Sequence, residues 1–161
     1  MEQTVNKNII HDKWMKYALS EALKAYENDE IPVGAIIIKD NQIIAKGYNQ
    51  KELLRDATAH AEIIAITSAS INLENWRLDD CVMYVTMEPC AMCAGAIINS
   101  RIKSVYFGVY DEGSGCCGSL YQICQDPRMN HQTTVRGGIL EKDSKSLLQN
   151  FFKLKRKPKA E

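Results

Sequence analysis

Apolar residues follow two different periods along the first third of the chain. Between positions 11 and 28 they recur every three or four residues, which predicts a helix that ends before Pro32. The runs VGAIII and IIAKGY come next, and both are rich in β-branched residues. The tight turn Asp40-Asn41 lies between them, so the sequence predicts a β-hairpin.

A second helix and a βαβ unit are predicted in the middle of the chain. After the polar loop QKELLRDA, a segment rich in Ala and Ile predicts a helix through about Ser70, and Thr58 is a suitable N-cap. The apolar run at 81–87 predicts a buried strand, Pro89 begins a helix, and the run at 104–109 predicts another strand. Strands joined through a helix in this way are parallel, with a right-handed crossover.

The last quarter of the chain predicts one more strand and a closing helix. We expect the strand near residues 133–137 and the helix over 144–155, with its inward face formed by Leu147, Leu148, Phe151 and Leu154. No repeat and no interdomain linker is visible in the sequence. The elements add up to an α/β fold, a three-layer α/β/α sandwich with a mixed central sheet of about five strands. We expect residues 1–161 to form a single domain.

Length and composition are consistent with one domain and indicate the cellular compartment in which we expect it. The chain has 161 residues, 45% of them hydrophobic, which is enough for one domain with a core. No run approaches the roughly 18 apolar residues of a membrane span, and the N-terminus lacks the pattern of a signal peptide. We therefore expect a cytoplasmic protein that does not enter a membrane. Its six cysteines are then reduced thiols or metal ligands rather than a disulfide framework.

Charge is balanced over the whole chain but concentrated at its end. The 20 basic and 20 acidic side chains argue against wholesale coating of nucleic acid, yet they leave room for a local patch. A basic tail at about 153–161 follows the aromatic pair Phe151-Phe152, and it includes Lys153, Lys155, Arg156 and Lys157. Taken alone, such a tail is more often a solvated terminus than a binding site.

The stretch PCAMC contains a C-x-x-C pair whose chemistry is ambiguous by itself. Cys90 and Cys93 could form a redox dithiol, half of a structural zinc site, or two ligands of a catalytic zinc. On a helix the two side chains share one face and can reach one ion. His60 could supply a third ligand, and three protein ligands leave the fourth tetrahedral position of zinc open for water.

Glu62 follows His60 by two residues and could serve the same metal site. Inside a helix that spacing turns two side chains about 200° apart, so both can face the metal only at a helix end, where our prediction places them. A zinc ion there would lower the pKa of its bound water to roughly 7, and Glu62 beside that water could accept and donate its proton. A redox dithiol would leave the pairing of His60 with Glu62 unexplained.

The order of these motifs resembles that of one family. H-x-E followed by P-C-x-x-C is the signature of zinc nucleobase deaminases. Over nearly its whole length the chain resembles the bacterial tRNA-specific adenosine deaminases, through IPVGAIII, GYN, TAHAEI, NWRL, YVTMEPCAMCAGAI, FGVYD, MNH, GGIL and the final FF before basic residues. The resemblance implies a cytidine deaminase-like fold and the hydrolytic deamination of the wobble adenosine in a tRNA anticodon loop to inosine.

The same resemblance implies roles for particular residues. His60, Cys90 and Cys93 would bind one zinc ion per subunit, and Glu62 would shuttle protons. The substrate would be surrounded by Val33, Asn49, Asp111, Asn130 and Phe152, and the RNA would contact the tail residues Lys153, Lys155, Arg156 and Lys157. The family works as a homodimer with tRNA bound across both subunits, and we expect a homodimer here. Without the resemblance, Asn49 and Asp111 would read as ordinary turn residues.

Two other functions stay open at this point. A deaminase of free guanine, cytosine or a nucleotide would share the zinc motif but would not need the basic, aromatic C-terminus. A catalytically silent RNA-binding protein with a structural zinc would have no use for Glu62. The stretch GSGCCGSL departs from the family, in which small residues such as alanine commonly replace Cys116 and Cys117. A second metal site with Cys124 or His131 is conceivable there, although adjacent cysteines reproduce a C-x-x-C chelate poorly.

Overall fold

A mixed sheet lies at the centre of the computed structural model, which describes residues 2–156 and the side chains from residue 8 onward. Within these residues five strands pair in the order β2-β1-β3-β4-β5. Strand β1 (Gly34–Lys39) is antiparallel both to β2 (Gln42–Tyr48) and to β3 (Val82–Met87). Strand β4 (Ser104–Val109) is parallel to β3, and β5 (Thr134–Arg136) is parallel to β4.

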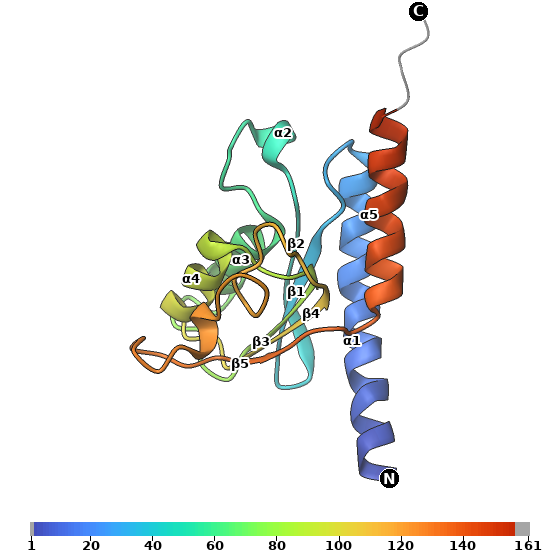
Figure 1. The fold of residues 1–161 in the computed structure, drawn as a ribbon. Helices are drawn as coiled ribbons and strands as arrows, with labels where there is room; N and C mark the ends of the chain where they lie inside the picture. The colour runs from blue at the N-terminus through green and yellow to red at the C-terminus, as the bar shows by residue number, and fades with distance from the viewer. Residues whose placement is uncertain (1, 157–161) are drawn as a thin grey trace, which may run out of the picture.

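Helices cover both faces of this sheet, as Figure 1 shows. Helices α1 (Glu2–Glu27) and α5 (Glu141–Arg156) lie on one face, where they contact β1, β3 and β4. Helices α3 (Ala61–Asn72) and α4 (Ala91–Asn99) lie on the other face. The short helix α2 (Lys51–Leu54) and the 3-10 turn η1 (Ile123–Gln125) complete the described part of the chain. The predicted three-layer α/β/α sandwich with a mixed sheet of about five strands is confirmed.

The hairpin and the βαβ unit form as the sequence predicts. Asp40 and Asn41, at the turn between β1 and β2, have φ angles of +48° and +61°. Asp and Asn tolerate this left-handed conformation, which hairpin turns of two residues require. Strands β3 and β4 are parallel and joined through α4, so the crossover helix lies on a face of the sheet.

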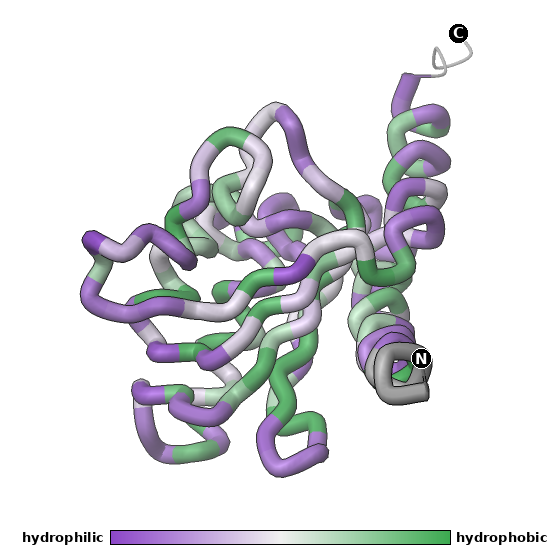
Figure 2. Tube along the Cα trace, turned by 60° about the horizontal axis from the view of Figure 1, so that its bottom comes forward, coloured by the Kyte–Doolittle hydropathy of each residue, from purple (hydrophilic) through white to green (hydrophobic). Residues whose placement is uncertain are grey.

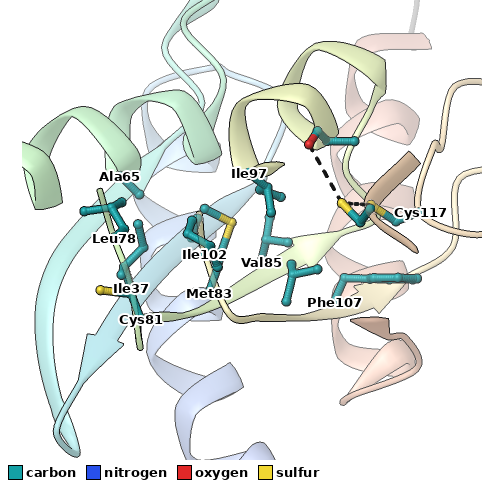
Figure 3. Packing of buried hydrophobic residues seen from close by; sticks show 14 of the residues in the cluster. Ile37, Ala65, Leu78, Cys81, Met83, Val85, Ile97, Ile102, Phe107 and Cys117 are labelled. Carbon is teal, nitrogen blue, oxygen red and sulfur yellow. Dashed lines mark hydrogen bonds between the residues drawn. The ribbon is translucent and has the colours of Figure 1, made fainter. Parts of the chain in front are cut away.

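The core lies on both sides of the sheet, because nearly every residue of the central strand β1 is buried. Figure 2 shows the hydrophobic residues that run along the central strands. One cluster fills the space between the sheet and the α3–α4 layer and includes Met83, Ile97 and Phe107 (Figure 3). The other cluster lies under α1 and is built around Trp14 and Tyr84.

Helix α1 comes unusually close to the sheet at Gly34. A Cβ atom there would collide with the backbone of Ala18 and Ala22, so the small residues of α1 and the glycine of β1 form a matched contact. This contact fixes α1 against the strand that leads into the site described below.

Five local predictions differ from the structure. Helix α1 begins at Glu2 instead of about residue 11, and its N-terminal part extends beyond the sheet (Figure 1). Ile9 and Ile10 in this part are 60% and 49% exposed, so they do not show the apolar period of a buried helix face. The predicted polar loop contains the short helix α2, and Leu154 on α5 points outward, with 56% of its surface exposed.

The predicted N-cap of α3 was also wrong. The hydroxyl group of Thr58 donates to Asp56 Oδ1 at 2.7 Å, so it is engaged outside the helix. His60 is the N-cap residue instead. Similarly, Cys90 is the N-cap of α4, so Pro89, predicted to begin this helix, lies one residue before its N-cap. Both differences move the chemically active residues to the helix ends themselves.

Candidate metal centre and substrate cavity

Nitrogen and sulfur donors converge between the N-termini of α3 and α4. His60 Nδ1 lies 3.7 Å from Cys90 Sγ and 3.5 Å from Cys93 Sγ. The three donor atoms lie within 4.8 Å of one another, and they are the cluster found among the described side chains that could hold a metal ion. The structure therefore brings together the three residues that the sequence predicted as ligands.

The helix starts explain why these side chains meet. His60 and Cys90 are N-cap residues with extended backbone angles, and Cys93 lies in the first turn of α4. The N-termini of the two helices are neighbours because α3 and α4 pack side by side on one face of the sheet. Unpaired N–H groups at a helix N-terminus favour negative charge, so the position also suits thiolates.

Electrostatics place the first negative charge on Cys90. A hydrogen bond with Cys93 lowers the pKa of Cys90 to about 4, and a hydrogen bond with His60 acts in the same direction. The contact between the two cysteines raises the pKa of Cys93, because that thiol must donate to its thiolate neighbour. The hydrogen bond with Cys90 raises the pKa of His60. A dication among the three groups would stabilise both thiolates and a neutral imidazole.

The donor set fits a zinc ion. Zinc–sulfur bonds of about 2.3 Å and zinc–nitrogen bonds of about 2.0–2.1 Å at tetrahedral angles separate nitrogen from sulfur by about 3.6 Å. The separations of 3.5 and 3.7 Å in the structure lie on either side of that value. Thiolate and imidazole ligands also suit zinc better than magnesium or calcium. Three ligands leave one tetrahedral position for a further molecule.

Glu62 lies in the first turn of α3, directly beside the ligand set. Its side chain is only 3% exposed, and it lines the same cavity as His60 and Cys90. Burial raises the pKa of this carboxyl group to about 7. Because His60 precedes the helix as its N-cap, both side chains can face one site despite their spacing of two residues.

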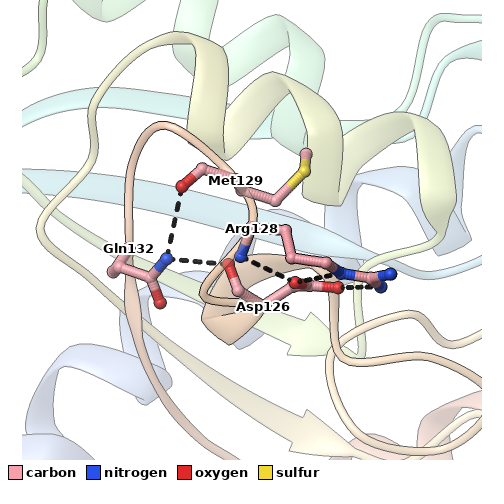
Figure 4. A network of polar contacts seen from close by, with 4 residues as sticks. All are labelled: Asp126, Arg128, Met129 and Gln132. Atoms are coloured by element: carbon pink, nitrogen blue, oxygen red, sulfur yellow. Dashed lines mark hydrogen bonds and ion pairs between the residues drawn. The ribbon is translucent and has the colours of Figure 1, made fainter.

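A cavity of about 240 Å³ opens in front of these groups. Four of the residues predicted to surround the substrate line it, namely Val33, Asn49, Asp111 and Phe152. Asn130 does not line it and lies instead on an exposed loop. That loop is closed by its own polar contacts, in which Arg128 and Gln132 bind the side chain and backbone of Asp126 (Figure 4).

Asn49 and Asp111 hold turns as well as facing the cavity. Asn49 donates from Nδ2 to the Ile31 carbonyl oxygen at 3.2 Å and accepts from the Lys51 amide at 3.3 Å. The Asp111 carboxylate accepts from the backbone N–H groups of Gly113 and Ser114 and from the Ser114 hydroxyl. Asn49 and Asp111 can therefore be turn residues and substrate-binding residues at the same time.

The other cavity residues were not predicted from the sequence as parts of a site. They come from six separate segments and comprise Ile31, Lys51, Ala61, Met87, Glu88, Ser114 and Leu148. Lys51, two residues after Asn49, and Glu88, directly before Pro89, adjoin motifs that the sequence did single out. The apolar members resemble core residues in their pattern, and only the fold places them at the cavity.

The adjacent phenylalanines of α5 have different environments. Phe151 is buried, whereas Phe152 is 41% exposed at the cavity. Lys153 and Arg156 line a second groove next to Phe152. Lys155 instead pairs with Asp29 on the side of α1, at 2.5 Å. Lys157 and the rest of the tail lie outside the described residues.

The remaining cysteines belong to the core rather than to a second cluster. Cys117 Sγ lies 3.6 Å from Cys124 Sγ, and Cys124 Sγ also contacts the Ala94 carbonyl oxygen (Figure 3). His131 donates from Nε2 to the Ile102 carbonyl oxygen at 2.8 Å. No second group of three metal donors occurs among the side chains that the structure describes, so the second metal site finds no support.

The protein is a deaminase domain, as its sandwich fold, its His-Cys-Cys cluster and the neighbouring glutamate indicate. The model of the MafB19-like deaminase family matches residues 9–156. The chain is 43% identical to the tRNA-specific adenosine deaminase of Bacillus subtilis over 91% of each chain. It is also similar to a structure from studies of A-to-I editing by tRNA:A34 deaminases at the wobble position, with a TM-score of 0.81 and 40% identity. That match covers 84% of this chain and 99% of the other.

This chain therefore belongs to the MafB19-like deaminase family, and its curated relatives place it with the tRNA-specific adenosine deaminases. It is also similar to the guanine deaminase of Bacillus subtilis, with a TM-score of 0.60 and 41% identity. That likeness covers 62% of this chain and 64% of the other. Among the described residues no helix is long and apolar enough to cross a membrane.

Proposed function

We propose that this protein is a zinc-dependent hydrolase that converts the wobble adenosine of a tRNA anticodon loop to inosine and releases ammonia. The observation that carries the proposal is a single cavity that joins a His-Cys-Cys ligand set, a buried carboxylate and an exposed aromatic side chain. The likeness to tRNA-specific adenosine deaminases over 91% of the chain supports the choice of substrate.

His60, Cys90 and Cys93 would hold the zinc ion. Bound there, the ion would act as a Lewis acid and lower the pKa of a water molecule to about 7. The two thiolates balance the charge of the dication, so the site as a whole is neutral and can be buried at little electrostatic cost. Cys93 is fully buried and Cys90 faces the cavity, so the ligands enclose one side of the site and leave the other to the substrate.

Glu62 would move the protons of the reaction. It would take one proton from the attacking water and give it to a ring nitrogen of adenine. It would then carry the proton that remains on the added hydroxyl group to the departing amino group, so that water and adenosine yield inosine and ammonia. A carboxyl group whose pKa lies near 7 can both accept and donate at neutral pH, and burial provides that pKa here.

The cavity rim would hold the flipped nucleotide. Asn49 and Asp111 offer polar atoms to it, Val33 offers an apolar contact, and Phe152 offers an exposed ring on which a base can stack. Lys153 and Arg156 lie next to that ring and would bind phosphate groups of the RNA. Anticodon loops suit such a site because their bases are already largely unstacked.

A free-base deaminase is the rival supported by the likeness to guanine deaminase. A free base would not need an exposed aromatic ring flanked by cations, which favours RNA. The test incubates zinc-loaded protein with an anticodon stem-loop that carries a wobble adenosine, and separately with guanine and with cytosine. We expect inosine and ammonia from the stem-loop. Ammonia from a free base without inosine from RNA would establish the rival.

We also propose a homodimer in the cytoplasm, where tRNA is modified. The outer side of α3 carries an apolar groove lined by Leu54, Ile63, Ile64 and Ile71, and Leu54 and Ile71 are more than half exposed. A second subunit would remove this surface from water. Light scattering after gel filtration should give twice the chain mass of 18.2 kDa. A monomer at micromolar concentration would contradict the homodimer.

A further inference from the structure

Glu88 is a buried acidic residue at the cavity whose carboxylate is hydrogen-bonded to a loop. It follows β3 directly and precedes Pro89, and its side chain is 3% exposed. Its backbone amide donates to the Val109 carbonyl oxygen at 2.9 Å, which continues the pairing of β3 with β4. Nothing in the proton transfer described above uses this carboxylate, so its burial calls for another explanation.

Donors from one loop surround both carboxylate oxygens. Oε1 accepts from the Asp111 amide at 3.1 Å and from the Ser119 hydroxyl at 2.5 Å. Oε2 accepts from the Cys117 amide at 3.2 Å and from the Ser119 amide at 3.0 Å. A buried carboxylate with this many donors is strongly held, because hydrogen bonds to charged groups are stronger than those between neutral groups.

The loop is shaped to reach this carboxylate. A Cβ atom at Gly115 would collide with the Glu88 carboxylate and with the Asp111 carbonyl oxygen, so the backbone comes as close as a glycine allows. The Gly115 amide donates to the Asp111 carbonyl oxygen, and the Cys116 amide donates to the Pro89 carbonyl oxygen, both at 2.8 Å. Residues 111–119 therefore surround the side chain of Glu88, which belongs to a different segment of the chain.

This loop forms a wall of the substrate cavity. Asp111 and Ser114 line the cavity, and the Asp111 carboxylate is itself oriented by the amides of Gly113 and Ser114. Glu88 holds the backbone of Asp111 at one end of the loop and that of Ser119 at the other. Other parts of the cavity lining come from α3, the N-cap of α4 and the segment around Asn49, and the hydrogen bonds of the Glu88 carboxylate go to the loop instead.

We propose that Glu88 is a positioning residue for the proposed reaction: its buried carboxylate gathers the backbone of residues 111–119 and so fixes the wall of the substrate cavity that carries Asp111. The inference rests on the proposed function for its effect on substrate, but the order of the loop can be measured without any substrate.

Glu88→Gln is the sharpest probe because it keeps the size of the side chain. Each carboxylate oxygen accepts from two donors, so either orientation of the amide would direct an NH₂ group at a backbone N–H group. Glu112→Gln is the matched control, since Glu112 is an exposed residue of the same loop and the change in charge is the same. Ser119→Ala is a milder second variant that removes the hydroxyl bond to Oε1 and leaves Glu88 in place.

The experiment compares zinc-loaded proteins by hydrogen exchange, metal content and steady-state kinetics on the stem-loop. For Glu88→Gln we expect unchanged zinc, faster exchange of the amides of Asp111, Cys117 and Ser119 by about 5- to 150-fold, and a KM raised by a similar factor with a smaller change in kcat. Ser119→Ala should shift the same amides in the same direction by a smaller factor. Glu112→Gln should match the wild type.

Three results would overturn the inference. Exchange of the three amides at the wild-type rate in both Glu88→Gln and Ser119→Ala would show that the carboxylate does not order the loop. Loss of zinc from Glu88→Gln would place its role at the metal ligands instead. Faster exchange with an unchanged KM would make the role structural only. If wild-type protein does not deaminate RNA, the proposed function fails, while the exchange data still decide whether Glu88 orders the loop.

Discussion

Replacement of Glu62 by glutamine tests the chemistry of the cavity most sharply. The amide keeps the size of the side chain and its buried position in the first turn of α3, but it cannot carry a proton. The other carboxylates that line the cavity are engaged elsewhere, Glu88 with the loop 111–119 and Asp111 with Gly113 and Ser114. No spare carboxylate on the described cavity wall can therefore replace Glu62.

General acid–base catalysis contributes about 10²- to 10⁴-fold to a reaction rate. Because Glu62 serves more than one proton transfer and has no substitute, we expect Glu62→Gln to lower kcat by about 10³- to 10⁴-fold, which corresponds to about 4–5.5 kcal/mol of activation free energy. The assay measures single-turnover formation of inosine on the stem-loop by zinc-loaded protein. The exposed Glu74→Gln variant is the control. A loss of less than about tenfold, with zinc and folding intact, would refute the assigned role.

Other parts of the account make their own predictions. Removal of zinc by a chelator should abolish inosine formation, and zinc but not magnesium should restore it; full activity of protein shown to contain no metal would contradict the assignment. Phe152→Ala should raise KM for the stem-loop by about 5- to 150-fold without changing Tm, because this ring is exposed at the cavity. Phe151→Ala should lower the free energy of unfolding by about 3–5 kcal/mol, because this ring is buried. The reverse pattern would be evidence against our placement of the two rings. Gly34→Ala should lower the free energy of unfolding by at least about 1–3 kcal/mol, because the added Cβ atom would meet the backbone of α1. Gly113→Ala is the control, because its added Cβ atom would make an ordinary 3.5 Å contact. Equal denaturation midpoints for the two variants would argue against the close contact at Gly34.

The strands were the most predictable elements because their burial is continuous. The apolar runs at 34–39, 82–87 and 104–109 lie within the central sheet, and each predicted range was correct to within a residue or two. The beginning of α1 could not be found in the same way. Ile9 and Ile10 are exposed, so they do not follow the apolar period by which a buried helix face is recognised.

The metal ligands were predictable because they belong to short sequence motifs with fixed spacing. His60, Cys90 and Cys93 come from two short segments with fixed spacing, and the fold brings their helix starts together. The cavity walls were less predictable. Ile31 and Leu148 have the apolar character of core residues, and only the packing of separate segments turns them toward the substrate. The position of Asn130 was expected from resemblance alone, and the structure places it on an exposed loop away from the lining residues.

The position of inosine within an anticodon loop tests the central claim most directly. Zinc-loaded protein would be incubated with two stem-loops of equal composition, one with adenosine at the wobble position and one with that adenosine moved by a single position. Inosine would be located by mass spectrometry of nuclease fragments. The account predicts inosine at the wobble position of the first RNA and almost none in the second. No inosine in either RNA, or equal conversion in both, would contradict it.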